Sequence, residues 1–162
     1  MIAVVCLSFI LITACKLSVP SSTDFIEFDK EGIKAGEEYV MEVPETLRPL
    51  IEEQACDIYL LLRFTHNLKI NRFPVSVEYS DPQKDSIFRH DIMITLFDST
   101  YNDMSTGKPG ILEKRFLIVK NYSPSEGFFF SFKTEQENTQ GILSAALFFE
   151  LIENQEEKKL YN

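Results

Sequence analysis

Short apolar segments of six to twelve residues recur along most of the chain, and polar turns separate them. Apolar and polar residues alternate in most of these segments, which is typical of β-strands and not of helices. The expected strands are residues 24–29, 38–43, 57–64, 73–79, 90–98, 112–119, 127–133 and 141–152. Eight strands without a long helix predict an all-β fold, namely an antiparallel β-sandwich of jelly-roll type.

The pattern within several segments predicts which side chains enter the core. In residues 73–79 and 127–133 apolar residues recur at every second position, so one face of each strand is expected to be buried. These residues are Phe73, Val75, Val77, Tyr79, Phe128, Phe130 and Phe132. Residues 57–64 form a nearly continuous apolar run, interrupted at Arg63, which predicts a strand covered on both faces. Residues 44–54 contain two prolines, which favours one short helical turn or a packed loop.

The first fifteen residues differ from the rest because they are mostly apolar and carry no charged side chain. The apolar run 3–12 is shorter than the ~20 residues that a membrane-spanning helix needs, and it ends in small residues, as a signal sequence does. The order Ile12-Thr13-Ala14-Cys15 resembles a bacterial lipobox, in which the cysteine is lipidated and becomes the first residue of the mature protein. We therefore expect a cleaved signal peptide at residues 1–14 and a lipid on Cys15.

A usual signal carries Lys or Arg before its apolar run, and this chain does not, so the opening strand of a core is the alternative. On the lipoprotein hypothesis, residues 15–23 are the lipid anchor and a flexible polar tether. Residues 24–153 then form the β-sandwich, and residues 154–162 form a charged tail. Cleavage removes 14 of the 162 residues and leaves 148, a length typical of a single domain.

The net charge bears on the class of partner, and the number of cysteines bears on disulfide formation. The chain has 16 basic and 25 acidic residues and a net charge of -9. Nucleic-acid binding depends on clustered Lys and Arg, so we expect no nucleic-acid partner. Cys6 lies in the signal segment and Cys15 carries the lipid, which leaves Cys56 alone. We therefore expect no internal disulfide, and a buried Cys56 thiol beside an apolar strand.

Motifs for catalysis, metals and cofactors are weak. The segment Gly107-Lys108-Pro109-Gly110 lacks the spacing of a phosphate-binding loop. The two histidines, His66 and His90, lie 24 positions apart and outside any zinc-binding spacing. We expect no enzymatic activity, no metal, no cofactor and no small-molecule substrate. A sugar-binding platform of Tyr79, Tyr101 and Tyr122 is the alternative, although the chain has no Trp, the usual sugar-stacking residue.

A spaced pattern over most of the chain resembles a known family. It comprises Tyr59-Leu60-Leu61-Leu62-Arg63, Arg72-Phe73-Pro74-Val75-Ser76-Val77, Asp91-Ile92-Met93-Ile94-Thr95-Leu96-Phe97-Asp98, Gly107 and Gly110, Gly127-Phe128-Phe129-Phe130, and Gly141-Ile142. With the lipobox-like segment, this pattern resembles the GldH family, gliding-motility-associated lipoproteins of Bacteroidetes. This chain departs from the family at Pro74-Val75, where the family usually has Asn-Leu. The resemblance implies an envelope lipoprotein of the gliding and type IX secretion setting, without known enzymatic activity or cofactor.

Two hypotheses for function follow. The first is a membrane-anchored protein that binds other envelope proteins through the long loop 99–110, with Tyr101 and Met104 in contact and Arg63 and Arg72 near it. Each arginine has a simpler alternative, an ion pair with a neighbouring Asp or Glu. The second hypothesis is a sugar-binding lipoprotein of a glycan-uptake system. Residues 16–19 lack the acidic run that, by resemblance, marks surface-exported lipoproteins, so we expect the periplasmic face of the outer membrane.

Replacing the lipobox cysteine tests the anchor. We expect Cys15→Ala to abolish incorporation of radioactive palmitate, because no other residue offers the acylated thiol at a lipobox. Labelling of cells that express the original chain or the variant measures this. Equal labelling of the two chains would contradict lipidation at Cys15.

Overall fold

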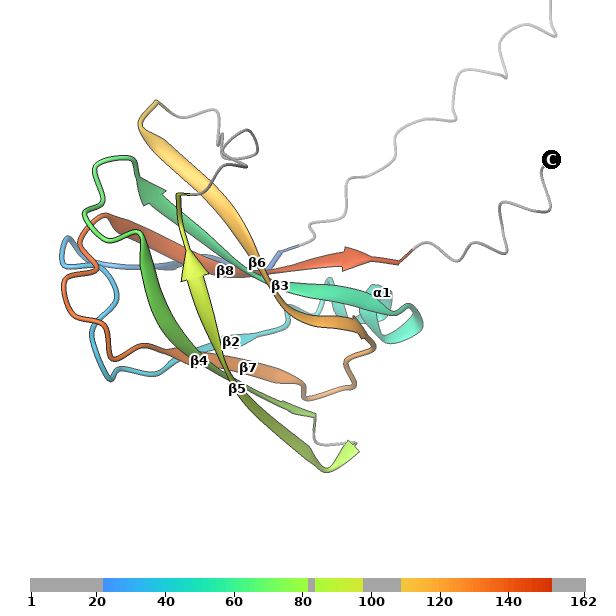
Figure 1. Ribbon diagram of the computed structural model, residues 1–162. Helices are drawn as coiled ribbons and strands as arrows, with labels where there is room; N and C mark the ends of the chain where they lie inside the picture. Colours follow the sequence, from blue (N-terminus) through green and yellow to red (C-terminus); the bar gives the residue numbers. More distant parts are fainter. Residues whose placement is uncertain (1–21, 82–83, 98–108, 153–162) are drawn as a thin grey trace, which may run out of the picture.

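The computed structural model describes residues 22–81, 84–97 and 109–152, and within them the chain forms eight strands and one short helix (Figure 1). Their bounds are β1 Ile26–Glu27, β2 Tyr39–Glu42, α1 Arg48–Glu53, β3 Cys56–Thr65, β4 Arg72–Asp81, β5 Ser86–Thr95, β6 Ile111–Tyr122, β7 Phe129–Lys133 and β8 Ile142–Leu151. All eight strands predicted from the sequence are present. Residues 44–54 contain only the six-residue helix α1, in agreement with the expected helical turn.

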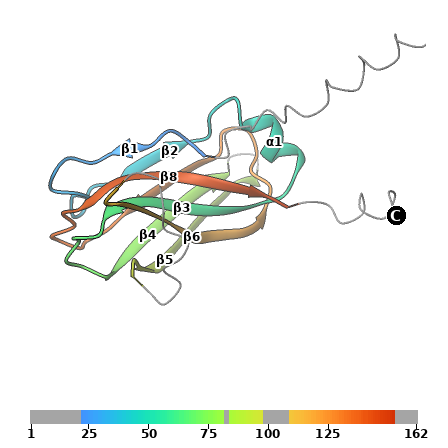
Figure 2. The same cartoon turned by 90° about the horizontal axis from the view of Figure 1, so that it is seen from above.

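The strands form two antiparallel sheets, in the orders β1-β8-β3-β6 and β2-β7-β4-β5. Across the two sheets, β1 pairs with β8, β2 with β7, β3 with β6 and β4 with β5. This is the pairing of one long hairpin that has been rolled up, which is the jelly-roll arrangement. The predicted antiparallel β-sandwich of jelly-roll type is therefore confirmed. Viewed from above, β4 and β5 run obliquely beneath β3 and β8 (Figure 2).

Aromatic and aliphatic side chains from both sheets fill the space between the sheets. The largest fully buried side chains are those of Phe64, Phe73, Phe130, Phe132, Phe149, Leu47, Ile51, Ile58, Leu60, Leu62, Ile94 and Leu96. All seven residues predicted to face the core in β4 and around β7 are buried. Burial of one such side chain contributes about 1.5–3 kcal/mol, so this layer is the main source of stability.

Two expectations about strands need correction. The strand β5 begins at Ser86, not at His90, because Ser86–Thr95 pairs along its whole length with β4 although its first half is largely exposed. The strand β3 faces the core only with every second residue from Cys56 to Phe64, where the expectation was two covered faces. On its outer side Leu61 is buried between its cross-strand partners Arg115 and Ala146, and within the described ranges no second layer of strands or helices packs on this face.

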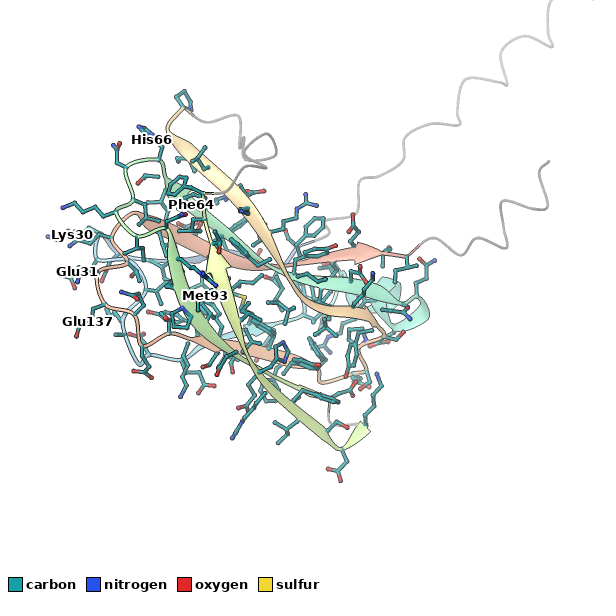
Figure 3. The ribbon with its side chains drawn as sticks, in the orientation of Figure 1. Lys30, Glu31, Phe64, His66, Met93 and Glu137 are labelled. Carbon is teal, nitrogen blue, oxygen red and sulfur yellow. The ribbon has the colours of Figure 1, made fainter. Side chains whose placement is uncertain are left out.

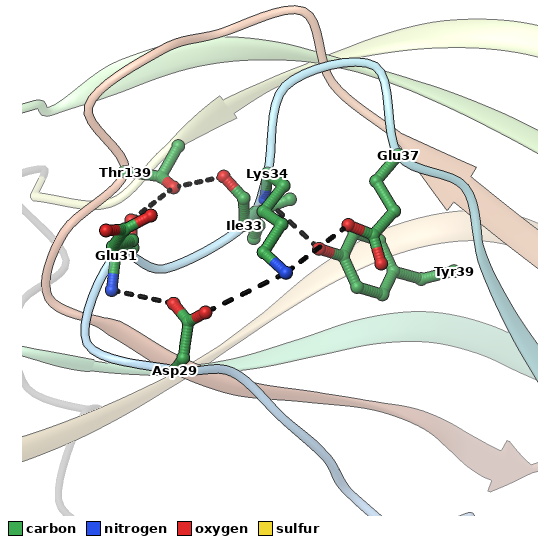
Figure 4. A network of polar contacts seen from close by, with 7 residues as sticks. All are labelled: Asp29, Glu31, Ile33, Lys34, Glu37, Tyr39 and Thr139. Atoms are coloured by element: carbon green, nitrogen blue, oxygen red, sulfur yellow. Dashed lines mark hydrogen bonds and ion pairs between the residues drawn. The ribbon is translucent and has the colours of Figure 1, made fainter.

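Hydrogen bonds join the loop between β1 and β2 to the loop before β8 (Figure 4). The hydroxyl of Thr139, which is fully buried, donates to the carbonyl oxygen of Ile33 at 2.6 Å. Gly32 has a φ of +83° at this crossing, and a Cβ atom there would lie 2.2 Å from the Thr139 carbonyl oxygen. Only glycine fits this position, since a side chain would meet both backbone strain and a steric clash.

At the other side of the sandwich, β5 and β6 are edge strands of their respective sheets. Lys114 lies on β6 opposite Leu62, so its side chain points between the sheets. Its ammonium donates to the carbonyl oxygens of Thr95 at 2.8 Å and Leu96 at 3.5 Å. One charged side chain therefore joins the two sheets where β5 ends.

Substitution of Gly32 by Ala should destabilise the fold by roughly 1–3 kcal/mol more than substitution of Gly36. Gly36 is the matched control because its φ is also positive, at +76°, but the nearest atom to an added Cβ is 3.6 Å away. The difference between the two variants therefore isolates the clash with Thr139. Chemical denaturation measures both free energies of unfolding, and equal losses would contradict the close approach.

Candidate functional site

The described part of the chain begins with a segment that is hydrogen bonded to β8. Ser22 forms a β-bridge with Phe148, and the backbone N–H of Thr23 donates to the carbonyl oxygen of Leu147 at 2.9 Å. The hydroxyl of Thr23, in turn, accepts a hydrogen bond from the N–H of Leu147 at 2.9 Å. The last two residues of the expected tether 15–23 are therefore paired with the sandwich, whereas Cys15 and the signal segment 1–14 lie outside the described residues.

This pairing defines two ends of the molecule. The tether end carries α1, the turn between β4 and β5, the loop 123–128 and the end of β8. The described chain begins beside the end of β8, while the β4–β5 hairpin lies at the bottom of the view in Figure 1. The far end carries the loops 28–38, 66–71 and 134–141. β5 runs from the tether end to the far end, because Asp81 pairs with Ser86 at one end of the hairpin and Arg72 with Thr95 at the other.

Two arginines lie over aromatic rings on the outer side of the sheet β1-β8-β3-β6. The guanidinium of Arg63 lies 3.5 Å from the ring centroid of Phe25, and that of Arg115 lies 3.7 Å from the ring centroid of Phe148. Tyr59 packs edge-on against Phe148, with the ring centroids 6.1 Å apart. These five residues are named here the arginine–aromatic face.

Buried residues underlie this face, and one of them, Ala146, has a small side chain. Ala146 and Leu61 are cross-strand partners at its centre, and both are almost fully buried. Stacking on an aromatic ring fixes a guanidinium without using its N–H groups, which stay available for acceptors. Arginine and aromatic residues are also the side chains enriched in the central contacts of protein interfaces.

Polar partners at the rim further order the face. The Arg63 side chain donates to the carboxylate of Glu113 at 2.9 Å. The hydroxyl of Tyr59 donates to Glu150 at 2.8 Å, and this hydrogen bond is the main cause that raises the pKa of Tyr59 to about 12. Within the described residues no ion pair involves Arg115. Its charge is therefore available to a carboxylate from outside the described part of the chain.

The residues proposed from the sequence to bind a partner do not form one described cluster. Arg63 belongs to the arginine–aromatic face and has the ion pair that was considered as its simpler role. Arg72 is exposed at the start of β4, on the outer side of the other sheet. Tyr101 and Met104 lie outside the described residues. Sequence reasoning missed Arg115, because only the strand register shows that it stacks on Phe148.

A polar groove of about 410 Å³ crosses the outer side of the sheet β2-β7-β4-β5. The Ser76 hydroxyl donates to Asp91 at 2.6 Å, and Arg89 donates to Glu78 across β4 and β5. The Ser131 hydroxyl donates to the carboxylate of Glu38 at 2.7 Å; Glu38 and Ser131 also line the groove. Alternating hydroxyls and carboxylates give the groove many acceptors for the hydroxyl groups of a ligand.

The tyrosines proposed as a sugar platform have other contacts. Tyr79 is 7% exposed and packs against Phe128, while the Tyr122 hydroxyl donates to Asp81 at 2.9 Å. Asp81, which has no exposed side-chain surface, also accepts hydrogen bonds from Ser125 and Lys84. Tyr79 and Tyr122 thus help to build the core, and Tyr101 lies outside the described residues.

The remaining reactive side chains have structural surroundings. Cys56 is buried, and this burial is the main cause that raises the pKa of its thiol to about 11. His90 packs edge-on against Tyr79 with the ring centroids 6.0 Å apart, whereas His66 is exposed at the far end. Within residues 22–81, 84–97 and 109–152, no three His, Cys, Asp or Glu side chains are grouped so that they could hold a metal ion.

Comparisons with known proteins leave the family open. No family model matches the chain, and no curated protein is significantly similar to it. Over the described ranges, no helix has the length and apolar character needed to cross a membrane.

Asp81 should contribute stability that depends on pH. Burial alone would raise the pKa of Asp81, but hydrogen bonds from Lys84 and Tyr122 and the charge of Lys84 outweigh burial and lower it. Because the pKa of Asp81 is lower in the folded state than in the unfolded state, the ionised carboxylate stabilises the fold at pH values above the unfolded-state pKa of about 3.9. This stabilisation is lost as the pH falls through the pKa of the folded state. Asp81→Asn should therefore cost roughly 1.5–3 kcal/mol at pH 7, and the gap to the original chain should narrow below about pH 4.

Denaturation over a series of pH values measures this gap, and Asp85→Asn is the matched control. Asp85 is exposed in the same turn, and its replacement removes the same charge. Since Asp85 has a φ of +46°, a conformation that Asn also tolerates, the control introduces little backbone strain. If the difference in free energy of unfolding between Asp81→Asn and the original chain does not change with pH, the carboxylate of Asp81 is not ionised in its buried position.

Proposed function

We propose that this chain is a lipid-anchored protein of the bacterial cell envelope that acts by binding other envelope proteins and not by catalysis. The assembly that it joins is of the gliding-motility or type IX secretion kind, as its resemblance to the GldH family implies. Its anchor is the lipid on Cys15, and its place is the periplasmic face of the outer membrane.

The observation that carries the proposal is the pairing of Ser22 and Thr23 with β8. Ser22 lies seven residues after Cys15. A chain of seven residues spans at most roughly 25 Å, so a lipid on Cys15 would hold the sandwich close to the membrane surface. A rigid domain on a short tether suits a protein that presents a surface to membrane-bound partners.

The arginine–aromatic face supports protein contact as the mode of action. Its side chains are already ordered by stacking, so a partner would meet little loss of side-chain entropy on binding. Leu117, which is 47% exposed and lies across from Tyr59 on β6, extends the face with apolar surface. Such a combination of rigid Arg, aromatic and aliphatic side chains is typical of the energetically important centre of an interface.

The polar groove on the opposite sheet is the observation that favours the alternative, a sugar-binding lipoprotein. Its hydroxyls and carboxylates could accept hydrogen bonds from a glycan. Saturable binding in a titration of the domain against a glycan panel, lost in Asp91→Ala, would favour this alternative over an adapter.

Crosslinking in cells tests the contact surface. We expect the double substitution Arg63→Ala and Arg115→Ala to reduce recovery of a crosslinked partner more than about tenfold, since residues at the centre of an interface cost more than about 1 kcal/mol each. A second arm replaces Tyr101 and Met104 by Ala and tests the long loop in the same assay.

The matched control for the arginine arm is Lys30→Ala with Lys69→Ala, which removes the same charge from exposed positions at the far end. Thermal unfolding of each variant separates lost contact from lost folding. Unchanged recovery in the arginine arm, with a folded protein, would exclude the arginine–aromatic face as the contact surface.

A further inference from the structure

The well-exposed large apolar side chains of the described residues are unevenly placed. They are Val40, Ile87, Phe88, Met93, Leu117 and Leu151. Ile87, at 65% exposure, and Phe88, at 40%, are consecutive at the start of β5, beside the turn at the tether end. Leu151, at the end of β8, belongs to the same end of the molecule.

The β4–β5 hairpin projects beyond the body of the sandwich at this end (Figure 1). β7 pairs with β4 from Ser76 to Ser80, so β4 has a neighbour on both sides almost to its end at Asp81, whereas β5 has no second neighbour in the sheet. Consecutive strand residues point to opposite faces, so Ile87 and Phe88 give the projecting hairpin an apolar side chain on each face. Phe88 stacks on Tyr79 with the ring centroids 4.9 Å apart, which fixes its position.

The hairpin and the beginning of the described chain lie at the same end of the strands but at opposite edges of the sandwich, and contacts across β6, β3 and β8 connect them. Lys84, in the turn, donates to the carbonyl oxygen of Ser123. The neighbouring Tyr122 pairs with Cys56, which pairs with Leu151 of β8, the strand that also holds Ser22. A short link from Cys15 to Ser22 would therefore bring this end toward the membrane.

Charged side chains lie at both ends of the molecule. The far end presents charged and polar side chains, among them Lys30, Glu31, His66 and Glu137 (Figure 3). Around the exposed apolar pair, Lys84 is paired with Asp81 and Arg89 with Glu78, while Asp85 and Glu126 are exposed acidic residues. This end therefore has no excess of basic charge, and apolar burial, not attraction to anionic headgroups, would hold it on a zwitterionic lipid surface.

We propose that Ile87 and Phe88 contact the lipid bilayer to which the protein is anchored, so that the far end points away from the membrane. This inference rests on the proposed function, because the lipid on Cys15 brings the hairpin to the bilayer. The apolar contact would restrict how the domain tilts on its tether. The arginine–aromatic face would then stay accessible to partners.

The chain contains no Trp, which allows a clean fluorescent probe to be placed at either end of β5. Ile87→Trp puts the probe beside the turn, and Met93→Trp is the matched control on the same outer face of the same strand, 50% exposed in the original chain. The two positions are about 20 Å apart along the strand. Each full-length lipidated variant is reconstituted into phosphatidylcholine vesicles with and without brominated acyl chains.

We expect the emission of Trp at position 87 to shift to the blue and to lose most of its intensity in brominated vesicles, and the emission at position 93 to stay unchanged. Equal quenching at both positions, stronger quenching at position 93, or no quenching at position 87 would overturn the inference. A blue shift at position 87 without quenching by bromine would show that protein, such as a second copy, covers the hairpin, and would also overturn it.

Mass spectrometry of Cys15 in the same samples separates a failure of the lipid anchor from a failure of the membrane contact at Ile87 and Phe88. If Cys15 carries lipid and Trp at position 87 is not quenched, the membrane contact fails while the anchor stands. If Cys15 carries no lipid, the anchor fails, and the inference that depends on it fails with it.

Discussion

The hydrogen-bonded pairing of the N-terminal segment with β8 is the constraint on which the arrangement of this protein depends. It makes Ser22–Glu27 the edge of the first sheet and fixes the end at which the chain enters the domain. It also brings Phe25 beside the central strands, where its ring receives Arg63. The same few backbone contacts therefore set one edge of the sheet, the composition of its outer face and the point at which the described chain enters the domain.

Buried small residues explain why one outer face can be both ordered and flat. Ser144 and Ala146 of β8 leave space above the sheet, and the arginine side chains fill that space without leaving the surface. Their aliphatic stems cover apolar atoms while the guanidinium groups remain at the solvent boundary. The opposite sheet uses serines and carboxylates instead, and these pair with one another across the strands. The two outer faces thus offer different chemistry to the surroundings.

The sequence indicates the strands well because alternation is a local property. The buried faces of β4 and β7 could be predicted from every second residue, and the position of Cys56 beside an apolar run predicted its burial. The start of β5 was missed because Ile87 and Phe88 are apolar neighbours on opposite, exposed faces, a pattern that does not resemble a half-buried strand. Strand order and register could not be predicted, since they depend on contacts between residues far apart in the sequence. For that reason the stacking of Arg115 on Phe148 was also beyond prediction.

Lys114 has a consequence for molecules gathered side by side on a membrane. A long outer strand such as β6 exposes backbone groups that could template the strand of a neighbour. An approaching strand that tried to continue the layer would have to tolerate an inward ammonium already committed to the carbonyls of Thr95 and Leu96. Inward-pointing charges of this kind are a known protection against edge-to-edge aggregation. Closely spaced copies would then remain monomeric and would not pair edge to edge into fibrils.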